Sequence, residues 1–477
     1  MIDTHSIEIT EMNAGNDRIG VNIHIPMDWI KLLSKKRLGQ PTAETNPNRA
    51  PFQRDFDRII FSAAFRRLQD KTQVHPLSES DYVRTRLTHS LETSCIGRSL
   101  GEIAGNCIIK KNGLESVVHQ SEFGSIVANA CLAHDIGNPP LGHSGEDAIR
   151  HWYKHSRVGE SFIEQVSEAE SQDFLNFEGN AQGFRVLCRL QTPDNIGGMQ
   201  LTCATLAAYT KYPRESLING DVIDLKRKSA KKFGFFQQDA KFFKEIAEEV
   251  GLKRIRSNNL WWCRHPLAFL VEAADDITYS VIDFEDGFRL GYIGYDEIEN
   301  VLSKFLEVKD KKQLSKIKGY NEKVEYLRAK TIHSLIMDVV AKFNEFQDSI
   351  LLGDFDESII SKIDNIHLVR EMKHISSQKA YCARNVLEIE AAGFQVLGDL
   401  VERFFEAAND VSKLKEKASE KSKKLIQLIP HQFRGEDTES DDVYSRMLKI
   451  TDFVSGMTDS FSVSLYKKIS GISLPRG

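Results

Sequence analysis

Apolar residues recur at helical intervals along most of the chain from Asp55 onward, and this spacing limits the fold more than any other feature. Intervals of three and four residues place Phe56, Ile59 and Ala63 on one stripe. Runs that alternate with a period of two are sparse, so few strands are expected. The pattern therefore predicts an all-α fold. Further helices are expected over residues 123–134, 144–155, 181–190, 239–250, 266–286, 296–307, 320–349, 356–373 and 379–406.

The length of 477 residues exceeds what one ordinary hydrophobic core holds. Hydrophobic residues make up 41% and charged residues 27% of the chain, as in folded globular proteins. Residues 1–53 are polar and turn-rich, and they predict an N-terminal arm that docks late or is partly disordered. A helical core over residues 54–310 and a second helical region over residues 311–477 are expected to follow.

Neither a membrane protein nor a secreted protein is indicated. Charged residues or histidines interrupt every apolar run before it is long enough to span a bilayer. The first residues lack a basic start and an apolar h-region, and the seven cysteines are scattered without a CxxC pair. A cytoplasmic location is therefore expected. The net charge of −5 gives no overall attraction to nucleic acid, and we interpret the basic run 226–232 as a solvated surface loop.

The stretch CLAHDIGNPPLGHSGEDAIR, residues 131–150, gathers proton-carrying and metal-binding groups in a short segment. Its His134-Asp135 pair follows an apolar helical segment and is expected to be partly buried, where an unpaired charge is costly. A divalent cation is one compensating partner. The GNPP turn ends this helix, and His143 and Glu146 share one face of the next helix. The turn therefore folds a second polar pair back towards the first.

A metal site needs more ligands than one adjacent pair, and two other segments offer them. His89 lies on an otherwise apolar helical segment, and Asp275 lies near the core-facing boundary of another. Each residue alone fits a core histidine or a solvated helix face better than a ligand. Together, in the order His, His-Asp, Asp on separate helices, they favour a metal site. Two imidazoles and two carboxylates suit Mg²⁺, Mn²⁺, Fe²⁺, Co²⁺, Ni²⁺ or Zn²⁺ and do not choose among them.

The order His89, His134-Asp135, Asp275 resembles the metal-ligand pattern of the HD-domain metal-dependent phosphohydrolases. From about Arg54 to Gly471, the flanking sequence is similar to one branch of this group, the deoxyguanosine triphosphate triphosphohydrolases and their dNTPase relatives. The resemblance implies an HD-domain helical core and a C-terminal helical region that closes over the nucleotide and contributes to oligomer contacts. The matching blocks are FRRLQDKTQV, RTRLTHSLE, AHDIGNPPLGHSGEDAI, FEGNAQGFRVL, LTCATLAAYTKYP, EAADDITYSVIDFEDGF and ITDFVSGMTDSFSVSLYKKISG.

The resemblance implies an enzyme that converts dGTP, or a broader set of dNTPs, into a deoxynucleoside and triphosphate. The cofactor it implies is a divalent metal ion, with Mg²⁺ or Mn²⁺ ahead of the other candidates. It assigns the metal to His89, His134, Asp135 and Asp275, and catalysis to His143 and Glu146. The substrate contacts it implies are Gln73, Tyr279 and Asp283 at the deoxyribose, Arg86, Lys211 and Tyr212 at the triphosphate, and Arg384 at the base or a phosphate.

Two alternatives stay open at the level of sequence. Another HD phosphohydrolase would act on a nucleoside monophosphate, a cyclic nucleotide or a guanosine-tetraphosphate-type alarmone, and the blocks FEGNAQGF and YTKYP weigh against it. A non-catalytic nucleotide-binding or nucleic-acid-binding regulator is disfavoured because no ligand position is substituted. The resemblance also implies a homo-oligomer, with a hexamer as the family's tendency, and single-stranded DNA as a candidate regulator.

Overall fold

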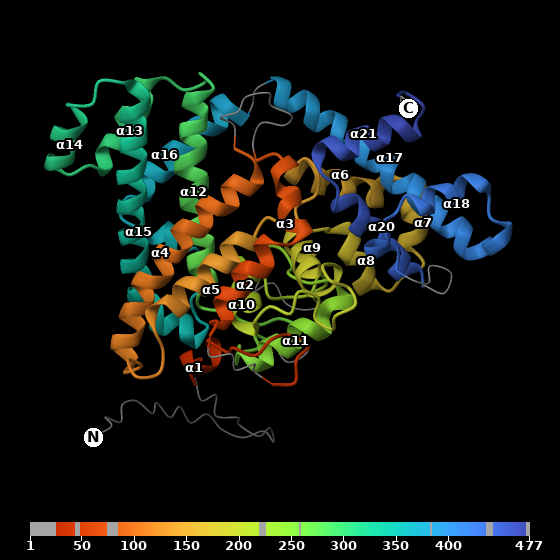
Figure 1. Cartoon of the computed structure of the whole chain (residues 1–477), viewed down its shortest axis with the longest axis horizontal. Coiled ribbons are helices and arrows are strands. Elements are labelled where there is room, and N and C mark those ends of the chain that lie inside the picture. Colours follow the sequence, from red (N-terminus) through yellow and green to blue (C-terminus); the bar gives the residue numbers. More distant parts are fainter. Residues whose placement is uncertain are drawn as a thin grey trace, which may run out of the picture.

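The computed structural model of the chain describes residues 25–42, 48–73, 84–218, 226–256, 259–381, 384–435 and 442–473. Within these ranges the regular structure is helical, and β-pairing is confined to isolated bridges such as that between Arg37 and Thr202 (Figure 1). The all-α prediction is confirmed. None of the described helices is long and apolar enough to cross a membrane.

The helices follow the predicted segments closely. The predicted helix 181–190, for example, is α9 (Gly179–Arg185) continued by a π-helical turn over Val186–Leu190. In the first part of the chain the helices are α1 (Trp29–Leu32), α2 (Pro51–Ile60), α3 (Ala63–Arg67), α4 (Arg86–Asn112), α5 (Gln120–Ala133), α6 (Gly142–His155), α7 (Arg157–Ile163), α8 (Glu168–Leu175), α9 (Gly179–Arg185), α10 (Cys203–Tyr209), α11 (Ala240–Glu249) and α12 (Ala268–Arg289). In the second part they are α13 (Tyr295–Leu302), α14 (Val308–Leu314), α15 (Tyr320–Leu352), α16 (Ile366–Ser376), α17 (Arg384–Leu414), α18 (Glu420–Gln427), α19 (His431–Arg434), α20 (Val443–Ser455) and α21 (Asp459–Ile469).

The predicted helix over residues 356–373 is wrong in its first half. Residues Ile359–Lys362 form a 3₁₀ turn, and α16 begins only at Ile366. The Asp356 carboxylate accepts hydrogen bonds from the backbone and hydroxyl of Ser229 and pairs with Arg264 at 2.6 Å. These long-range bonds hold the segment out of a helix, and hydrophobic periodicity cannot register them.

Three helices that pack on one another position the candidate site. Helices α4 and α5 approach so closely that a Cβ on Gly101 would lie 2.7 Å from the Phe123 carbonyl oxygen. A larger residue at this position would push the two helices apart. Helix α12 packs against both and buries Leu270, Ala274 and Ile277. The packing of these three helices in the centre of the core therefore fixes the segments that carry the predicted metal ligands.

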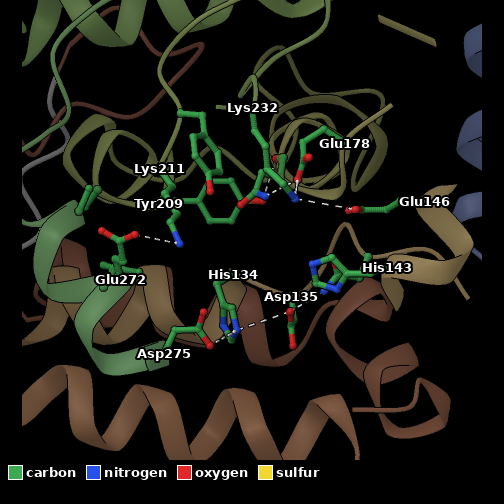
Figure 2. A pocket seen from close by; sticks show the side chains of 16 residues that line it. His134, Asp135, His143, Glu146, Glu178, Tyr209, Lys211, Lys232, Glu272 and Asp275 are labelled. Carbon is green, nitrogen blue, oxygen red and sulfur yellow. Dashed lines mark hydrogen bonds and ion pairs between the residues drawn. The ribbon is translucent and has the colours of Figure 1, made fainter. Parts of the chain in front are cut away.

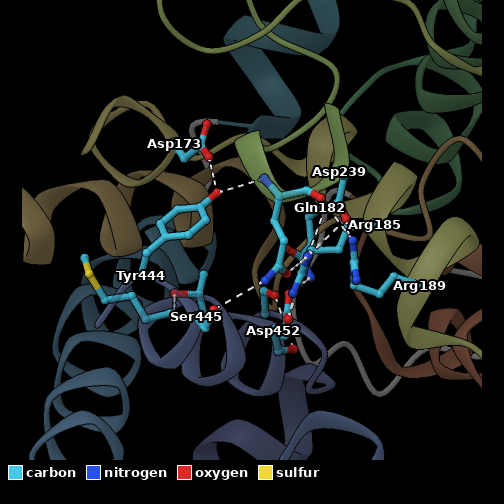
Figure 3. Close-up of polar contacts among 12 residues, drawn as sticks. Asp173, Gln182, Arg185, Arg189, Asp239, Tyr444, Ser445 and Asp452 are labelled. Carbon is cyan, nitrogen blue, oxygen red and sulfur yellow. Dashed lines mark hydrogen bonds and ion pairs between the residues drawn. The ribbon is translucent and has the colours of Figure 1, made fainter. Parts of the chain in front are cut away.

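The C-terminal helices pack against the core through buried charged groups as well as apolar side chains. Helix α17 lies against α6 and α20. Arg185 of α9 donates to Asp452 of α20 at 2.9 Å and pairs with Asp239 at 3.0 Å, and the Tyr444 hydroxyl of α20 donates to Asp173 (Figure 3). Because all of these groups are buried and paired, the C-terminal region is firmly docked where these helices meet.

The later part of the predicted N-terminal arm is packed on the core. Trp29, Leu32 and Leu38 are buried, and Arg37 forms a buried ion pair with Asp55 at 2.6 Å. Residues 1–24 and 43–47 of the predicted arm lie outside the described residues. The domain boundaries proposed from the sequence, at 53/54 and 310/311, stay predictions.

Candidate active site

Four side chains from α4, the end of α5 and α12 converge on one point. Ligand atoms of His89, His134 and Asp135 lie within 4.8 Å of one another. Oδ1 of Asp275 lies 3.2 Å from Nε2 of His89 and 3.5 Å from Nε2 of His134. Figure 2 shows His134, Asp135 and Asp275 on the floor of a cavity. The structure thus brings together the four residues that the sequence assigned to a metal.

The end of α5 fixes how His134 and Asp135 face this point. Nδ1 of His134 lies 2.6 Å from the Cys131 carbonyl oxygen, so we assign the ring proton to Nδ1 and the free lone pair to Nε2. Oδ1 of Asp135 pairs with Arg86 at 3.0 Å, whereas its buried Oδ2 has no hydrogen-bond partner among the described residues. An unpartnered buried carboxylate oxygen beside a free imidazole nitrogen fits a divalent cation.

The cluster keeps its two carboxylates in the ionised form that metal binding needs. Burial raises the pKa of Asp275, but the imidazoles of His134 and His89 outweigh it and hold this pKa well below its usual range. Burial likewise raises the pKa of Asp135, but the charges of Arg86 and the two histidines lower it by more, so this pKa is lowered overall. Burial lowers the pKa of His89, but the bond to Asp275 and the charge of Asp135 raise it overall. Both carboxylates are therefore ionised, as ligands must be.

The GNPP turn leads directly into α6, which carries the predicted catalytic pair. Leu141 and Gly142 adopt left-handed conformations with φ of 62° and 58°, and His143 follows at the start of the helix. We call His89, His134, Asp135 and Asp275 the metal cluster. His143 and Glu146 both line the cavity above it (Figure 2). No hydrogen bond joins these two side chains in the described part of the chain. Glu146 instead accepts a hydrogen bond from the Gly179 amide at 2.8 Å.

Lys232 adjusts the acidity of both members of this pair. Burial lowers the pKa of His143, and the positive charge of Lys232 lowers it further. Burial raises the pKa of Glu146, although Lys232, with its Nζ 3.9 Å from Oε2, opposes that effect. His143 is therefore a neutral imidazole near pH 7 and can accept a proton.

Lys211 and Lys232 line the cavity beside the cluster, of about 160 Å³, and each pairs with a buried carboxylate. Nζ of Lys211 lies 3.2 Å from Glu272, and Nζ of Lys228 lies 2.5 Å from the same carboxylate. Nζ of Lys232 lies 2.9 Å from Glu178 (Figure 2). The cavity thus offers ammonium groups to an anion.

These contacts correct the interpretation of the basic run 226–232 as a solvated loop. Lys228 and Lys232 turn inward because Glu272 and Glu178 are buried and need positive partners. Neither acid was singled out from the sequence, although Glu178 lies in the block FEGNAQGF. Tyr212, by contrast, was expected near a phosphate group and does line this cavity.

A second cavity, of about 510 Å³, adjoins the first and shares His143 and Asp275 with it. Gln73, Arg86 and Tyr279, all predicted to contact a nucleotide, line this larger cavity. The buried Oε1 of Gln73 has no hydrogen-bond partner in the part of the chain that the structure describes. The residues Asp276, Lys373, Val386 and Glu390, which the sequence did not single out, line it as well.

Two predicted substrate residues do not line either cavity. Asp283 is buried further along α12, where its charge contributes to the raised pKa of His89. The Arg384 side chain is 92% exposed at the start of α17 and pairs with Glu388 at 2.7 Å. The roles assigned to both residues stay predictions.

Two family models match the chain. The first, described as "HD domain", matches residues 86–182, which include His89, His134, Asp135, His143 and Glu146. The second, described as "Phosphohydrolase-associated domain", matches residues 365–468 in the C-terminal helical region.

The chain is also similar to known proteins over almost its whole length. A protein of Synechocystis sp. named deoxyguanosinetriphosphate triphosphohydrolase-like protein is 44% identical, with 94% of this chain and 100% of the relative covered. A Pseudomonas aeruginosa protein of the same name is 38% identical over the same shares. The Salmonella arizonae deoxyguanosinetriphosphate triphosphohydrolase is 29% identical, with 88% of this chain and 94% of the relative covered.

Proposed function

The chain belongs to the family of HD-domain deoxyguanosinetriphosphate triphosphohydrolases and their like proteins, and on this premise we propose that it hydrolyses dNTPs, dGTP foremost, to a deoxynucleoside and triphosphate. The observation that supports this most strongly is the junction of two cavities at the metal cluster. The lysine-containing cavity and the cavity lined by Tyr279 share His143 and Asp275. A deoxynucleoside triphosphate lying across the junction would have its α-phosphate beside both the cluster and His143.

In this proposal His89, His134, Asp135 and Asp275 hold the divalent cation. When bound, it supplies Lewis-acid polarisation of an α-phosphate oxygen. Arg86 keeps Asp135 turned towards the cluster, and its buried Nε has no partner among the described residues. This guanidinium is thus available to a phosphate oxygen as well.

In this proposal His143 and Glu146 carry out proton transfer from the attacking water. Water forms a bond to the α-phosphorus, the bond from phosphorus to the 5′ oxygen breaks, and that oxygen leaves with a proton. A neutral His143 accepts the proton of the attacking water, since its pKa is lowered by burial and by Lys232. Glu146 lines the cavity beside it and orients it once substrate is bound.

The remaining contacts follow the two cavities. Lys211, Tyr212 and Lys232 would bind the β- and γ-phosphates, because they line the polar cavity. Gln73, which lines the larger cavity, is assigned to the 3′-hydroxyl, and Asp283, which lines neither cavity, is assigned to it by family resemblance alone. The ring of Tyr279 is assigned to the 2′-carbon of the sugar, where it leaves no room for a 2′-hydroxyl. Arg384 is assigned to the base or phosphate side by family resemblance alone.

A product screen tests the proposal. The protein is incubated with each of the four dNTPs and with GTP, with and without Mn²⁺ and single-stranded DNA, and products are separated by ion chromatography. Triphosphate and a deoxynucleoside are the expected products. Monophosphate and pyrophosphate would mean attack on the α-phosphorus that expels pyrophosphate, and no turnover at all would favour a non-catalytic regulator. Light scattering of the same sample tests the proposed homo-oligomer.

A further inference from the structure

One buried carboxylate of the C-terminal region contacts two separate segments that line the larger cavity. Asp459 is the first residue of α21 and is 1% exposed. Its Oδ1 accepts a hydrogen bond from the Leu141 amide at 2.9 Å. Its Oδ2 accepts from the amide and the hydroxyl of Thr72, at 2.9 and 2.6 Å. These partners lie more than three hundred residues away in the chain, and neither is in the C-terminal region.

The first of these contacts holds a strained backbone. Leu141 has φ of 62° although it is not a glycine, and such a conformation persists only where surrounding contacts impose it. Leu141 is also the N-cap of α6 and stands two residues before His143. The bond from its amide to Asp459 thus sets the direction in which α6 leaves the turn.

The second contact holds the segment before Gln73. Thr72 is followed by Gln73, which lines the larger cavity and whose buried Oε1 has no hydrogen-bond partner among the described residues. The preceding Lys71 is buried as well and donates to the Ser455 carbonyl at 3.1 Å and to the Asn138 carbonyl in the GNPP turn. The hydrogen bonds of Asp459 and Lys71 therefore connect residues 71–73, the GNPP turn and the start of α21.

We propose that Asp459 is a positioning residue that couples the docked C-terminal helices to the first turn of α6 and to the segment of Gln73. It does not touch the substrate. It fixes where His143 and Gln73 stand relative to the metal cluster, so that the two cavities meet at the reacting phosphate. The catalytic part of this inference rests on the proposed function, whereas the positioning of the backbone does not.

The decisive variant is Asp459→Asn. Its amide keeps the size of the carboxylate but turns an NH₂ group towards amide donors, so at least one of the two contacts is lost. A displacement of about 1 Å at a reacting group can cost about 10²-fold in rate, and we expect a fall of that order in kcat with a rise in KM. Bound metal, measured by elemental analysis, should be unchanged.

Two matched variants separate positioning from general stability. Asp452→Asn weakens another buried carboxylate, on α20, that binds Arg185 and Gln182 rather than Leu141 and Thr72 (Figure 3). It should lower the melting temperature while the folded protein keeps its kcat. Thr72→Val removes only the hydroxyl bond to Asp459, so it should raise KM more than it lowers kcat.

Hydrogen exchange read by mass spectrometry gives a measurement that needs no substrate. Peptides covering the amide of Leu141 should exchange faster in Asp459→Asn and stay protected in Asp452→Asn. Normal kcat in folded Asp459→Asn, or equal loss of kcat in both variants, would overturn the inference. If Asp459→Asn does not fold, Thr72→Val decides, and an unchanged KM there refutes it. Wild-type protein that releases no triphosphate would refute the proposed function, while exchange at Leu141 would still test the positioning.

Discussion

At the scale of single residues, His134 can present only one ring nitrogen to the cluster. The other nitrogen donates to the Cys131 carbonyl at 2.6 Å, which fixes both the tautomer and the orientation of the ring. The lone pair on Nε2 therefore points at the place where Asp135 and Asp275 also point. Removing this ring leaves two ionised carboxylates and one histidine, which is a poorly filled ligand set.

We therefore predict that His134→Ala abolishes metal retention and turnover while the protein stays folded. Elemental analysis after gel filtration measures the metal, and circular dichroism measures the helical fold. His151→Ala serves as the control, because His151 is an exposed histidine on α6 outside the cluster. Full metal occupancy in His134→Ala would show that the four residues do not form the metal site.

His143 should matter to the reaction without mattering to binding. General acid–base groups typically contribute about 10²–10⁴-fold, so His143→Ala should lose that much in kcat while metal content and nucleotide affinity are retained. Glu146→Ala should act in the same direction, and the double variant should be little worse than either, because the residues act as a unit. Steady-state kinetics and hydrolysis in ¹⁸O-labelled water test this. Near-normal rates for His143→Ala, or label found in a monophosphate, would contradict the mechanism.

At the scale of elements, α12 carries three of the assigned residues at intervals of four. Asp275, Tyr279 and Asp283 therefore succeed one another along one side of the helix. Asp275 belongs to the metal cluster, Tyr279 lines the larger cavity, and Lys373 of α16 lies 5.6 Å from the centre of the Tyr279 ring. A helix is rigid, so a fixed metal ligand also fixes the distance to a ring one turn away.

This arrangement predicts that Tyr279 decides between deoxyribose and ribose. Tyr279→Ala opens space beside the sugar and should narrow the ratio of kcat/KM between dGTP and GTP. Tyr279→Phe keeps the ring and should preserve the ratio. Competition between the two nucleotides in one reaction measures it directly. Wild-type protein that hydrolyses GTP as well as dGTP would refute this role.

Residues on periodic helices could be predicted from the sequence, whereas residues that act through long-range bonds could not. The helices bearing His89 and Asp275 were recognisable from apolar spacing, and the structure brings these residues together. Lys228 and Lys232 lie in a segment without periodicity, so only the positions of Glu272 and Glu178 reveal that they turn inward. Asp459 is another such case, since its hydrogen-bond partners Leu141 and Thr72 are distant from it in the sequence.

At the scale of the whole molecule, stability depends on pH through buried groups with opposite effects. Burial raises the pKa of Asp173 to about 7, so the folded state keeps a proton that the unfolded state releases, and stability falls as the pH rises from about 4 to about 7. Burial lowers the pKa of His265 to about 4. Nε2 of His265 donates to the Leu32 carbonyl at 2.9 Å, and Nδ1 accepts from the Leu267 amide at 3.1 Å. A neutral His265 thus joins the N-terminal segment to the start of α12.

The unfolded chain protonates His265 near its ordinary value of 6.5, but the folded chain does so only near pH 4, so its contribution is complete above pH 6.5 and is lost as the pH falls towards 4. The difference between these values corresponds to about 3 kcal/mol. We therefore predict that the free energy of unfolding of wild-type protein, minus that of His265→Gln, decreases by about this amount from pH 7 to pH 4. Taking the difference cancels the contribution of Asp173 to the pH dependence, because both proteins contain this residue. Denaturant unfolding across this range measures it, with His151→Gln, at an exposed position of α6, as the control. Parallel curves for wild type and His265→Gln would mean that His265 takes up its proton in the folded state as easily as in the unfolded chain.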